Sequence, residues 1–449
     1  MCTAYETRTP WIPDEPRMDP RLIRFAVWGG GVVLVALPSS ASAACESRCA
    51  DLRVISPRAR VAHALGLERN IVAVSVAIFL LALGENLWKR FLPKYLQVLG
   101  APVTAIGLFG TCEDFLDGIY QYPGGWIGDR YGRRRALLLF VALAGIGYVL
   151  YWLAPTWPFV FLGLVFVMAW SSMASPTLFS VVGDTLPKER RALGFTVQSI
   201  LKRVPIAVAP TLGGLLIAAH GVEGGVRVGL LVTLALAVVT LPVVARVAIP
   251  ITKDAAPTNI MAVWATMPSP LRWLLVSDVF IRTCEGLVDV FLVLYAINVI
   301  GISAPGFGTL IAVQMTTAIL SYFPAGKLAD RVGRKPFVIA TFLAFSLFPI
   351  AVVLAGSFAG LVVAFVVGGL RELGEPSRKA LIVDLAEPTL RARSIGLYYL
   401  IRSLAIAPAA FIGGLLWQVT PALPFWTAGA IGLVGVIVFT RTVDERHAG

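Results

Sequence analysis

Long apolar segments separated by short polar ones dominate the chain from about residue 70 onward. Most are long enough to cross a bilayer, which takes about 20 apolar residues in an α-helix. The segments are continuously apolar, whereas the strands of a membrane β-barrel alternate. The sequence therefore predicts an all-α membrane protein with twelve transmembrane helices, at about 70–96, 103–126, 135–155, 158–184, 194–219, 226–249, 272–299, 304–326, 336–356, 358–385, 394–418 and 422–440.

A polar, proline-containing segment divides these twelve predicted helices into two sets of six. We interpret it as a cytoplasmic linker at 250–271, between an N-terminal half at 70–249 and a C-terminal half at 272–441. A short cytoplasmic tail follows at 442–449.

Residues 1–69 do not fit this pattern. Basic residues precede an apolar run from Phe25 to Leu37, and small residues follow, which is typical of a signal peptide. A cleaved leader and an interfacial helix are two interpretations. We expect instead a poorly ordered, over-extended N-terminus, with the natural start near residues 54–61.

Charge is scarce and unevenly placed. Hydrophobic residues make up 57% of the chain and charged residues 14%, compared with about 25% charged in soluble proteins. The formal net charge of +12 comes from basic residues in the loops on one side, which we assign to the cytoplasm. Both termini are therefore expected there, in a bacterial inner membrane, and nucleic acid is not expected as a partner.

One loop motif occurs twice, about 200 residues apart. It reads GWIGDRYGRR at 125–134 and GKLADRVGRK at 326–335. Further matches lie at an offset of 200, among them Glu85 with Glu285 and Lys202 with Arg402. The repeat predicts two related halves with an axis along the membrane normal.

The motif resembles the loop signature of the major facilitator superfamily, G-x-L-a-D-R-x-G-R-[KR]. The resemblance covers about 70–441 and implies a twelve-helix fold with alternating access of two halves. It also implies gating roles for the signature and for the loops after the fourth and tenth helices. The residues concerned are Gly125, Asp129, Arg130, Gly132, Arg133, Gly326, Asp330, Arg331, Gly333, Arg334, Asp184, Arg190, Asp384 and Arg391.

Charged residues also occur inside the predicted helices, where each costs about 2.5–3.5 kcal/mol on insertion scales. Such residues face protein or water, so they indicate a hydrated central cavity, although paired charges can also join the halves or act as gates. Carboxylates that could carry a proton are, in order of preference, Asp117, Asp114, Glu85 and Glu285. Further candidates for the substrate cavity are Glu113, Lys89, Lys202, Arg282, Asp289, Arg371, Glu375 and Arg402.

The sequence favours proton-coupled movement of a small organic solute, and export over import. Ala209-Pro210-Thr211-Leu212-Gly213-Gly214 resembles a segment of drug/proton antiporters, although close helix packing also explains it. The alternative is uptake of an anionic metabolite or chelate through Lys202, Arg402 and Arg371. A membrane sensor or enzyme is a remote third possibility. We expect no catalysis, cofactor or metal site, and a monomer in the lipid bilayer.

Overall fold

A computed structural model describes residues 23–28, 31–36, 69–175, 177–178, 188–246, 264–265, 267–386 and 391–443. The chain divides into two compact units, Met1–Leu65 and Gly66–Gly449.

The first unit contains a β-hairpin. β1 (Ile23–Trp28) pairs antiparallel with β2 (Gly31–Ala36), and Trp28 lies opposite Gly31. β2 is rich in valine, a residue favoured in strands. Much of the apolar run is therefore extended, where one hypothesis placed an interfacial helix. Our prediction of poor order concerns mainly residues outside the described ranges.

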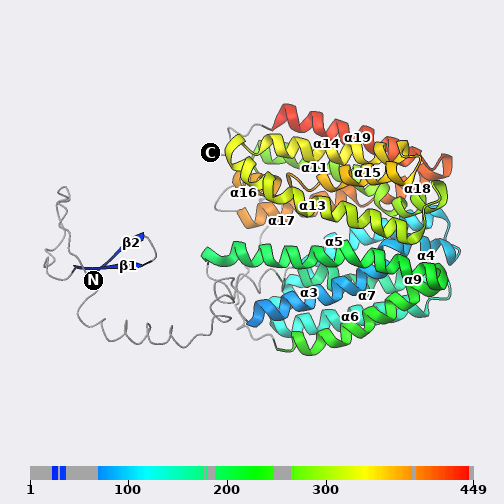
Figure 1. Ribbon diagram of the computed structural model, residues 1–449, viewed down its shortest axis with the longest axis horizontal. Coiled ribbons are helices and arrows are strands. Elements are labelled where there is room, and N and C mark those ends of the chain that lie inside the picture. The colour runs from blue at the N-terminus through cyan, green and yellow to red at the C-terminus, as the bar shows by residue number, and fades with distance from the viewer. Residues whose placement is uncertain are drawn as a thin grey trace. The chain divides into compact units, whose positions relative to one another are not determined.

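Every described secondary-structure element of the second unit is helical. A first helix set precedes residue 250 and a second set follows it (Figure 1). The first set consists of α3 (Arg69–Trp88), η2 (Lys89–Phe91), α4 (Leu92–Val98), α5 (Val103–Tyr131), α6 (Arg133–Leu153), α7 (Trp157–Met168), η3 (Ala169–Met173) and α9 (Lys188–Val244). The second consists of α11 (Ser269–Val288), η4 (Asp289–Phe291), α12 (Leu292–Leu294), η5 (Tyr295–Val299), α13 (Ala304–Val332), α14 (Lys335–Leu354), α15 (Phe358–Leu370), α16 (Glu375–Leu385), α17 (Arg391–Ile406), α18 (Ala409–Val419) and α19 (Leu423–Thr442).

Seven helical stretches of the described chain are long and apolar enough to cross a membrane. This confirms a helical multi-pass membrane protein. α5 and α11 are not among the seven, because charged residues interrupt their apolar sequence. α9 covers two of the predicted segments, and the non-helical backbone of Gly221 (φ 74°) marks the turn between them. α5 also extends beyond its predicted end into the loop motif.

Local breaks in the helices recur at the spacing of the sequence repeat. The 3₁₀ turns η2 and η4 interrupt the first helix of each set, and both end at a Phe-Leu step. The two copies of the motif each contain a glycine with positive φ, Gly132 at 90° and Gly333 at 96°. A left-handed backbone is accessible to glycine without steric cost, so these residues permit the turn into α6 and α14.

Glycines let the helices approach closely. A Cβ on Gly213 would lie 1.8 Å from the Leu87 carbonyl oxygen, and one on Gly413 would lie 2.3 Å from that of Leu287. Such contacts bring the backbones of α9 and α3, and of α18 and α11, together. A Cβ on Gly214 would lie 2.5 Å from the Ala304 carbonyl oxygen, so α9 also packs against the second set.

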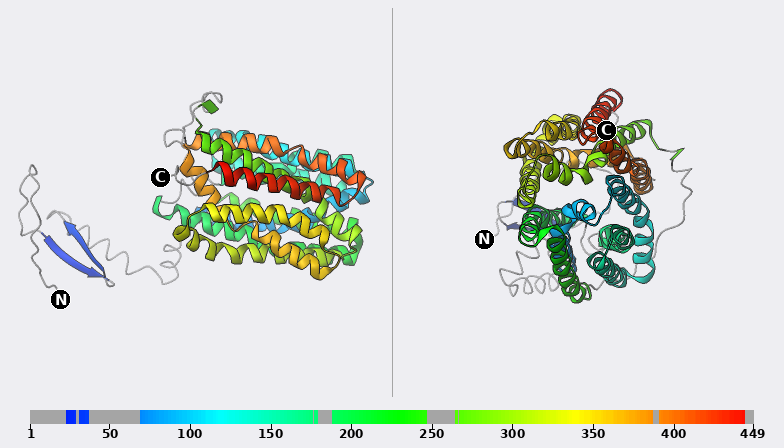
Figure 2. Two further views of the ribbon diagram at one scale, coloured as in Figure 1. Left: turned by 90° about the horizontal axis from the view of Figure 1, so that it is seen from above. Right: turned by 90° about the vertical axis from the view of Figure 1, so that its right-hand side faces the viewer.

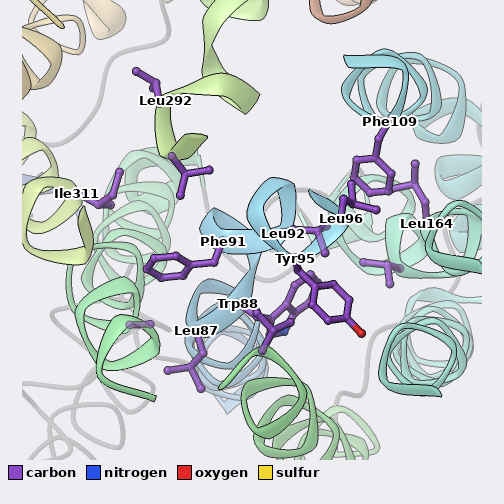
Figure 3. Close-up of a cluster of buried hydrophobic side chains, with 14 of the residues drawn as sticks. Leu87, Trp88, Phe91, Leu92, Tyr95, Leu96, Phe109, Leu164, Leu292 and Ile311 are labelled. Atoms are coloured by element: carbon purple, nitrogen blue, oxygen red, sulfur yellow. The ribbon is translucent and has the colours of Figure 1, made fainter. Parts of the chain in front are cut away.

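Aromatic and aliphatic side chains join the two sets near η2 and η4. Phe91, Leu292 and Ile311 belong to one buried hydrophobic cluster, and Figure 3 shows the Phe91 ring directed toward the side of Ile311. Phe91 also meets Phe307 edge to face, with ring centroids 5.7 Å apart. This packing holds the ends of the first helices together at the end of the bundle remote from the loop motifs.

Candidate functional site

A cavity of about 500 Å³ lies between the two helix sets. The end-on view of the bundle in Figure 2 (right) shows the helices of both sets arranged around a central region. The first set lines the cavity from α3, η2, α4, α5, η3 and α9, and the second from α11, η4, α17 and α18. Its charged lining residues are Glu85, Lys89, Arg90, Glu113, Asp114, Arg282, Glu285 and Asp289.

Two ion pairs lie on the cavity wall. Lys89 Nζ is 2.8 Å from Glu113 Oε1, which connects η2 to α5. Arg90 is 3.4 Å from Asp289, so η2 of the first set is linked to η4 of the second. The second pair is half-exposed and crosses the interface between the sets, so movement between them would break it.

Asp114 differs from the other acidic residues of the wall. It lines the cavity from α5 and is only partly buried. Within the described part of the chain, its carboxylate has no hydrogen-bond or ion-pair partner. It is therefore open to a ligand or a proton without the loss of an existing salt bridge.

The repeated glutamates have different partners. Glu85, 8% exposed, accepts a 2.6 Å hydrogen bond from the hydroxyl of Tyr148. Glu285 lies 2.8 Å from Arg282 and 3.4 Å from Arg371. In the second set Phe348 stands 200 positions after Tyr148, so the hydroxyl donor is missing and arginines take its place.

A buried network of charges lies in the second set, centred on Asp278. This carboxylate is fully buried and pairs with Arg378 at 2.6 Å and Arg402 at 3.4 Å. Tyr398 donates to it at 3.0 Å. Arg378 also pairs with Glu375 at 2.8 Å. The network therefore connects α11, α16 and α17 in the interior.

Arginines extend this network to the cavity. Arg282 pairs with Glu375 as well as Glu285, and Arg371 pairs with Glu285. The Arg371 guanidinium also lies 5.0 Å and 4.6 Å from the ring centres of Phe345 and Phe348. Cation–π contact of this kind stabilises a desolvated arginine.

The structure places only some of the predicted cavity residues at the cavity. Those that line it are Asp114, Glu85, Glu285, Glu113, Lys89, Arg282 and Asp289. Asp117, our first choice, is not among the lining residues and accepts a 2.6 Å hydrogen bond from Ser172. Arg371, Glu375 and Arg402 belong to the buried network and also do not line the cavity. The side chain of Lys202 lies outside the described residues.

The loop motif is only partly described. Arg130 lies over the rings of Trp126 and Tyr131, and Arg133 is buried. Arg334 pairs with Asp384, which joins the second motif to the end of α16. The side-chain surroundings of Asp129, Gly326, Asp330, Arg331, Arg190 and Arg391, and the whole of Asp184, lie outside the described residues.

Sequence reasoning missed three residues that hold the charges in place. Asp278 precedes Arg282 by four positions, so the two share a helix face. That spacing could have revealed Asp278. Tyr148 and Tyr398 carry no such signal, because a tyrosine in an apolar helix resembles any other aromatic residue. Among the described residues, no group of three or more His, Cys, Asp or Glu could hold a metal ion.

The fold and the cavity define a multi-pass helical membrane protein with a charged internal chamber. The family model of the Major Facilitator Superfamily matches residues 74–281 and 274–449. The chain belongs to this superfamily of membrane transporters.

Individual relatives are distant. An uncharacterized MFS-type transporter of Methanocaldococcus jannaschii is 21% identical over 387 residues, 82% of this chain and 93% of that protein. The quinolone resistance protein NorA of Staphylococcus aureus is 28% identical over 141 residues, 31% of this chain and 36% of NorA. The crystal structure of a POT family transporter in complex with a thioalcohol-conjugated peptide has a TM-score of 0.69. It is 15% identical and the match covers 83% of this chain and 95% of that chain, so it supports the shared fold alone.

Proposed function

We propose that the protein is a secondary active transporter that exports a small organic solute in exchange for protons. In this proposal twelve helices form two six-helix halves that rock about the central cavity. The monomer lies in a bacterial inner membrane with the loop motifs and both termini in the cytoplasm. The basic residues of the motifs support this orientation.

The observation that carries the proposal is the unpaired carboxylate of Asp114 on the cavity wall. Proton-coupled exchange needs a group that can bind either a proton or the substrate, but not both. Asp114 meets this requirement because no described cation neutralises it. Hydrogen bonds or ion pairs hold the three glutamates of the wall, Glu85, Glu113 and Glu285. Protonation of these carboxylates would weaken those bonds on the cavity wall.

The unpaired group is a carboxylate, which favours a cationic or neutral solute over an anion. Arg371 and Arg402, which an anion would need, are already paired with Glu285 and Asp278. The partial similarity to a quinolone resistance protein agrees with export of an organic compound. Uptake of an anion remains the second candidate, resting on Lys202.

The test is proton flux in proteoliposomes that contain the full-length protein and a pH-sensitive dye. Pools of organic cations, neutral metabolites and anions are added in turn. We expect a cationic or neutral pool to drive protons in the direction opposite to the solute, and Asp114→Asn to abolish this flux while solute exchange persists at raised solute concentration.

Asp117→Asn is the matched control, because Asp117 lies on the same helix but not on the cavity wall. It should retain coupled flux. Coupled flux that survives Asp114→Asn and is lost in Asp117→Asn would contradict the proposal. Solute and protons moving in the same direction would establish the uptake alternative.

A further inference from the structure

The two helix sets contribute different chemistry at equivalent positions. Among the small and apolar side chains that line the cavity from the first set, five have a charged counterpart 200 positions later, and we call these five the recess. They are Ile78, Ala82, Ser171, Ser175 and Leu178. The residues that follow them by 200 in the second set are all charged: Asp278, Arg282, Arg371, Glu375 and Arg378.

The charged counterparts are engaged with one another. Asp278 pairs with Arg378, and Glu375 pairs with both Arg282 and Arg378. Arg371 packs over two phenylalanine rings. Of the five, only Arg282 reaches the cavity wall. At positions where the first set has the uncharged recess residues, the second set therefore has charged side chains that are engaged in ion pairs.

The recess is suited to an apolar group. Ile78 and Leu178 provide aliphatic surface, and the alanine and two serines provide room. Trp170 and Phe109 line the same cavity and add aromatic surface from the first set. A flat or aromatic group could pack against this wall without displacing an ion pair, because none of the recess residues is charged.

The formal charge of the cavity wall is negative, although the whole chain is strongly positive. Among the described lining residues, five are acidic (Glu85, Glu113, Asp114, Glu285 and Asp289) and three are basic (Lys89, Arg90 and Arg282). Each of the three bases is paired with an acid. Of the other two acids, Glu85 accepts a hydrogen bond from Tyr148, so Asp114 is the one left to balance a positive charge brought by a ligand.

We propose that the recess binds the apolar body of a monovalent organic cation while Asp114 binds its charge. This inference rests on the proposed transport function and specifies its substrate class. The first helix set then determines which compounds bind, and the buried network of the second set holds Arg282 of the opposite wall in place. Buried, hydrogen-bonded ion pairs suit this role, since loss of one partner is strongly unfavourable.

The experiment compares two ions of the same shape and opposite charge. Binding of tetraphenylphosphonium and of tetraphenylborate to the purified full-length protein in lipid nanodiscs is measured by equilibrium dialysis. Ser175→Leu fills the recess. Ile406→Phe is the matched control, because it adds bulk to the same cavity from the second helix set. Thermal unfolding of each variant verifies that it is folded.

We expect the phosphonium to bind and the borate to bind far more weakly. Ser175→Leu should weaken phosphonium binding by about tenfold or more, because the leucine side chain takes up the space that the phenyl groups of the phosphonium would occupy. Asp114→Asn should weaken it similarly, and Ile406→Phe much less. Equal losses in Ser175→Leu and Ile406→Phe, preference for the borate, or no binding of either ion would overturn the inference.

Equilibrium binding separates this inference from the proposed function. One outcome is that the phosphonium binds with the expected pattern but no proton flux occurs in proteoliposomes. This would support the recess as a binding site and reject proton coupling. Proton-coupled flux of a solute that does not compete with the phosphonium would retain the transporter and reject the recess as its binding site.

Discussion

At the scale of single residues, burial decides which charges are permanent and which can separate. The Asp278 carboxylate and Arg378 guanidinium are almost fully inaccessible, at 0% and 2% of the side chain. The Arg90 and Asp289 side chains are 32% and 43% exposed. Removal of one partner from a buried pair leaves an uncompensated charge, whereas exposed pairs contribute about 0–1 kcal/mol. The first pair is therefore structural, and the second can open during transport.

We predict that Asp278→Asn strongly destabilises the protein. The change leaves Arg378 and Arg402 without their shared carboxylate, and loss of a buried partner costs on the order of 3–5 kcal/mol. Asp289→Asn is the control for loss of an exposed partner. Thermal unfolding in detergent should show a much larger fall in melting temperature for Asp278→Asn. Equal melting temperatures would show that the Asp278 network is not required for stability.

At the scale of helices, contacts between backbones depend on glycine. Gly213 touches the Leu87 carbonyl of α3, and Gly308 of α13 touches the Pro210 carbonyl of α9. Both contacts lie along α9, which therefore packs against a helix of its own set and a helix of the other. A membrane interior offers no hydrophobic force between helices, so close packing of small residues provides the attraction.

Gly213→Ala should lower the stability and yield of the folded protein. Its Cβ would meet backbone at 1.8 Å, and overpacking of this kind costs about 1–3 kcal/mol. Gly396→Ala on α17 is the control, since nothing lies within 4 Å of its Cβ. There alanine should be neutral or slightly stabilising, because it favours the helix. Size-exclusion profiles and melting temperatures measure both, and a wild-type profile for Gly213→Ala would be incompatible with this packing.

The ends of α4 and η5 form a second contact between the helix sets. Lys94 donates to Asn298 at 2.5 Å, and Asn298 donates to Gln97 at 3.0 Å. With the pair between Arg90 and Asp289, these bonds form a clasp at the end of the bundle remote from the loop motifs. The bonds are exposed, so water can replace them when the two sets separate.

We predict that loss of the clasp opens this end of the protein. Arg90→Gln combined with Asn298→Ala should increase the distance between spin labels at the exposed positions Val98 and Val299, measured by pulsed electron spin resonance. Arg227→Gln is the control, because its contacts, with Glu223 and with the Ala154 carbonyl, lie within the first helix set. An unchanged distance distribution in the double variant, or the same widening in the control, would rule out the clasp as a gate.

At the scale of the whole molecule, the distribution of basic residues predicts the orientation in the membrane. Arg134 is the last residue of the first loop motif, and Val299 lies near the clasp at the opposite end of the bundle. Cysteines introduced at Arg134 and Val299 should differ in their reaction with a membrane-impermeant maleimide, because they lie on opposite sides of the membrane. We expect Val299→Cys to be labelled from outside and Arg134→Cys only after permeabilisation. The wild-type chain provides the background from native cysteines, and the reverse pattern would invert the proposed topology.

The sequence repeat pointed to matching positions in the two helix sets but not to the asymmetry of the site. Equal spacing placed Glu85 and Glu285 at equivalent positions on the first helices. It could not show that Tyr148 holds one and that two arginines hold the other. From the sequence, Asp117 ranked above Asp114 because it lies twelve residues before Asp129 and therefore near the middle of the membrane. They are three residues apart on one helix, so the rotation and packing of that helix determined which one lines the cavity.

The sequence by itself determined the helical membrane class, the family and the positions of the charges. These follow from the hydrophobicity and charge of whole segments and from the repeated motif, which do not depend on contacts between helices. Tertiary structure decided which charges are neutralised and which face the cavity, because ion pairs form between helices distant in sequence. Asp278, Arg378 and Arg402 come together only when α11, α16 and α17 pack. The same packing left the recess uncharged in the first helix set, whereas the arginines of the second set pair with acids of their own set.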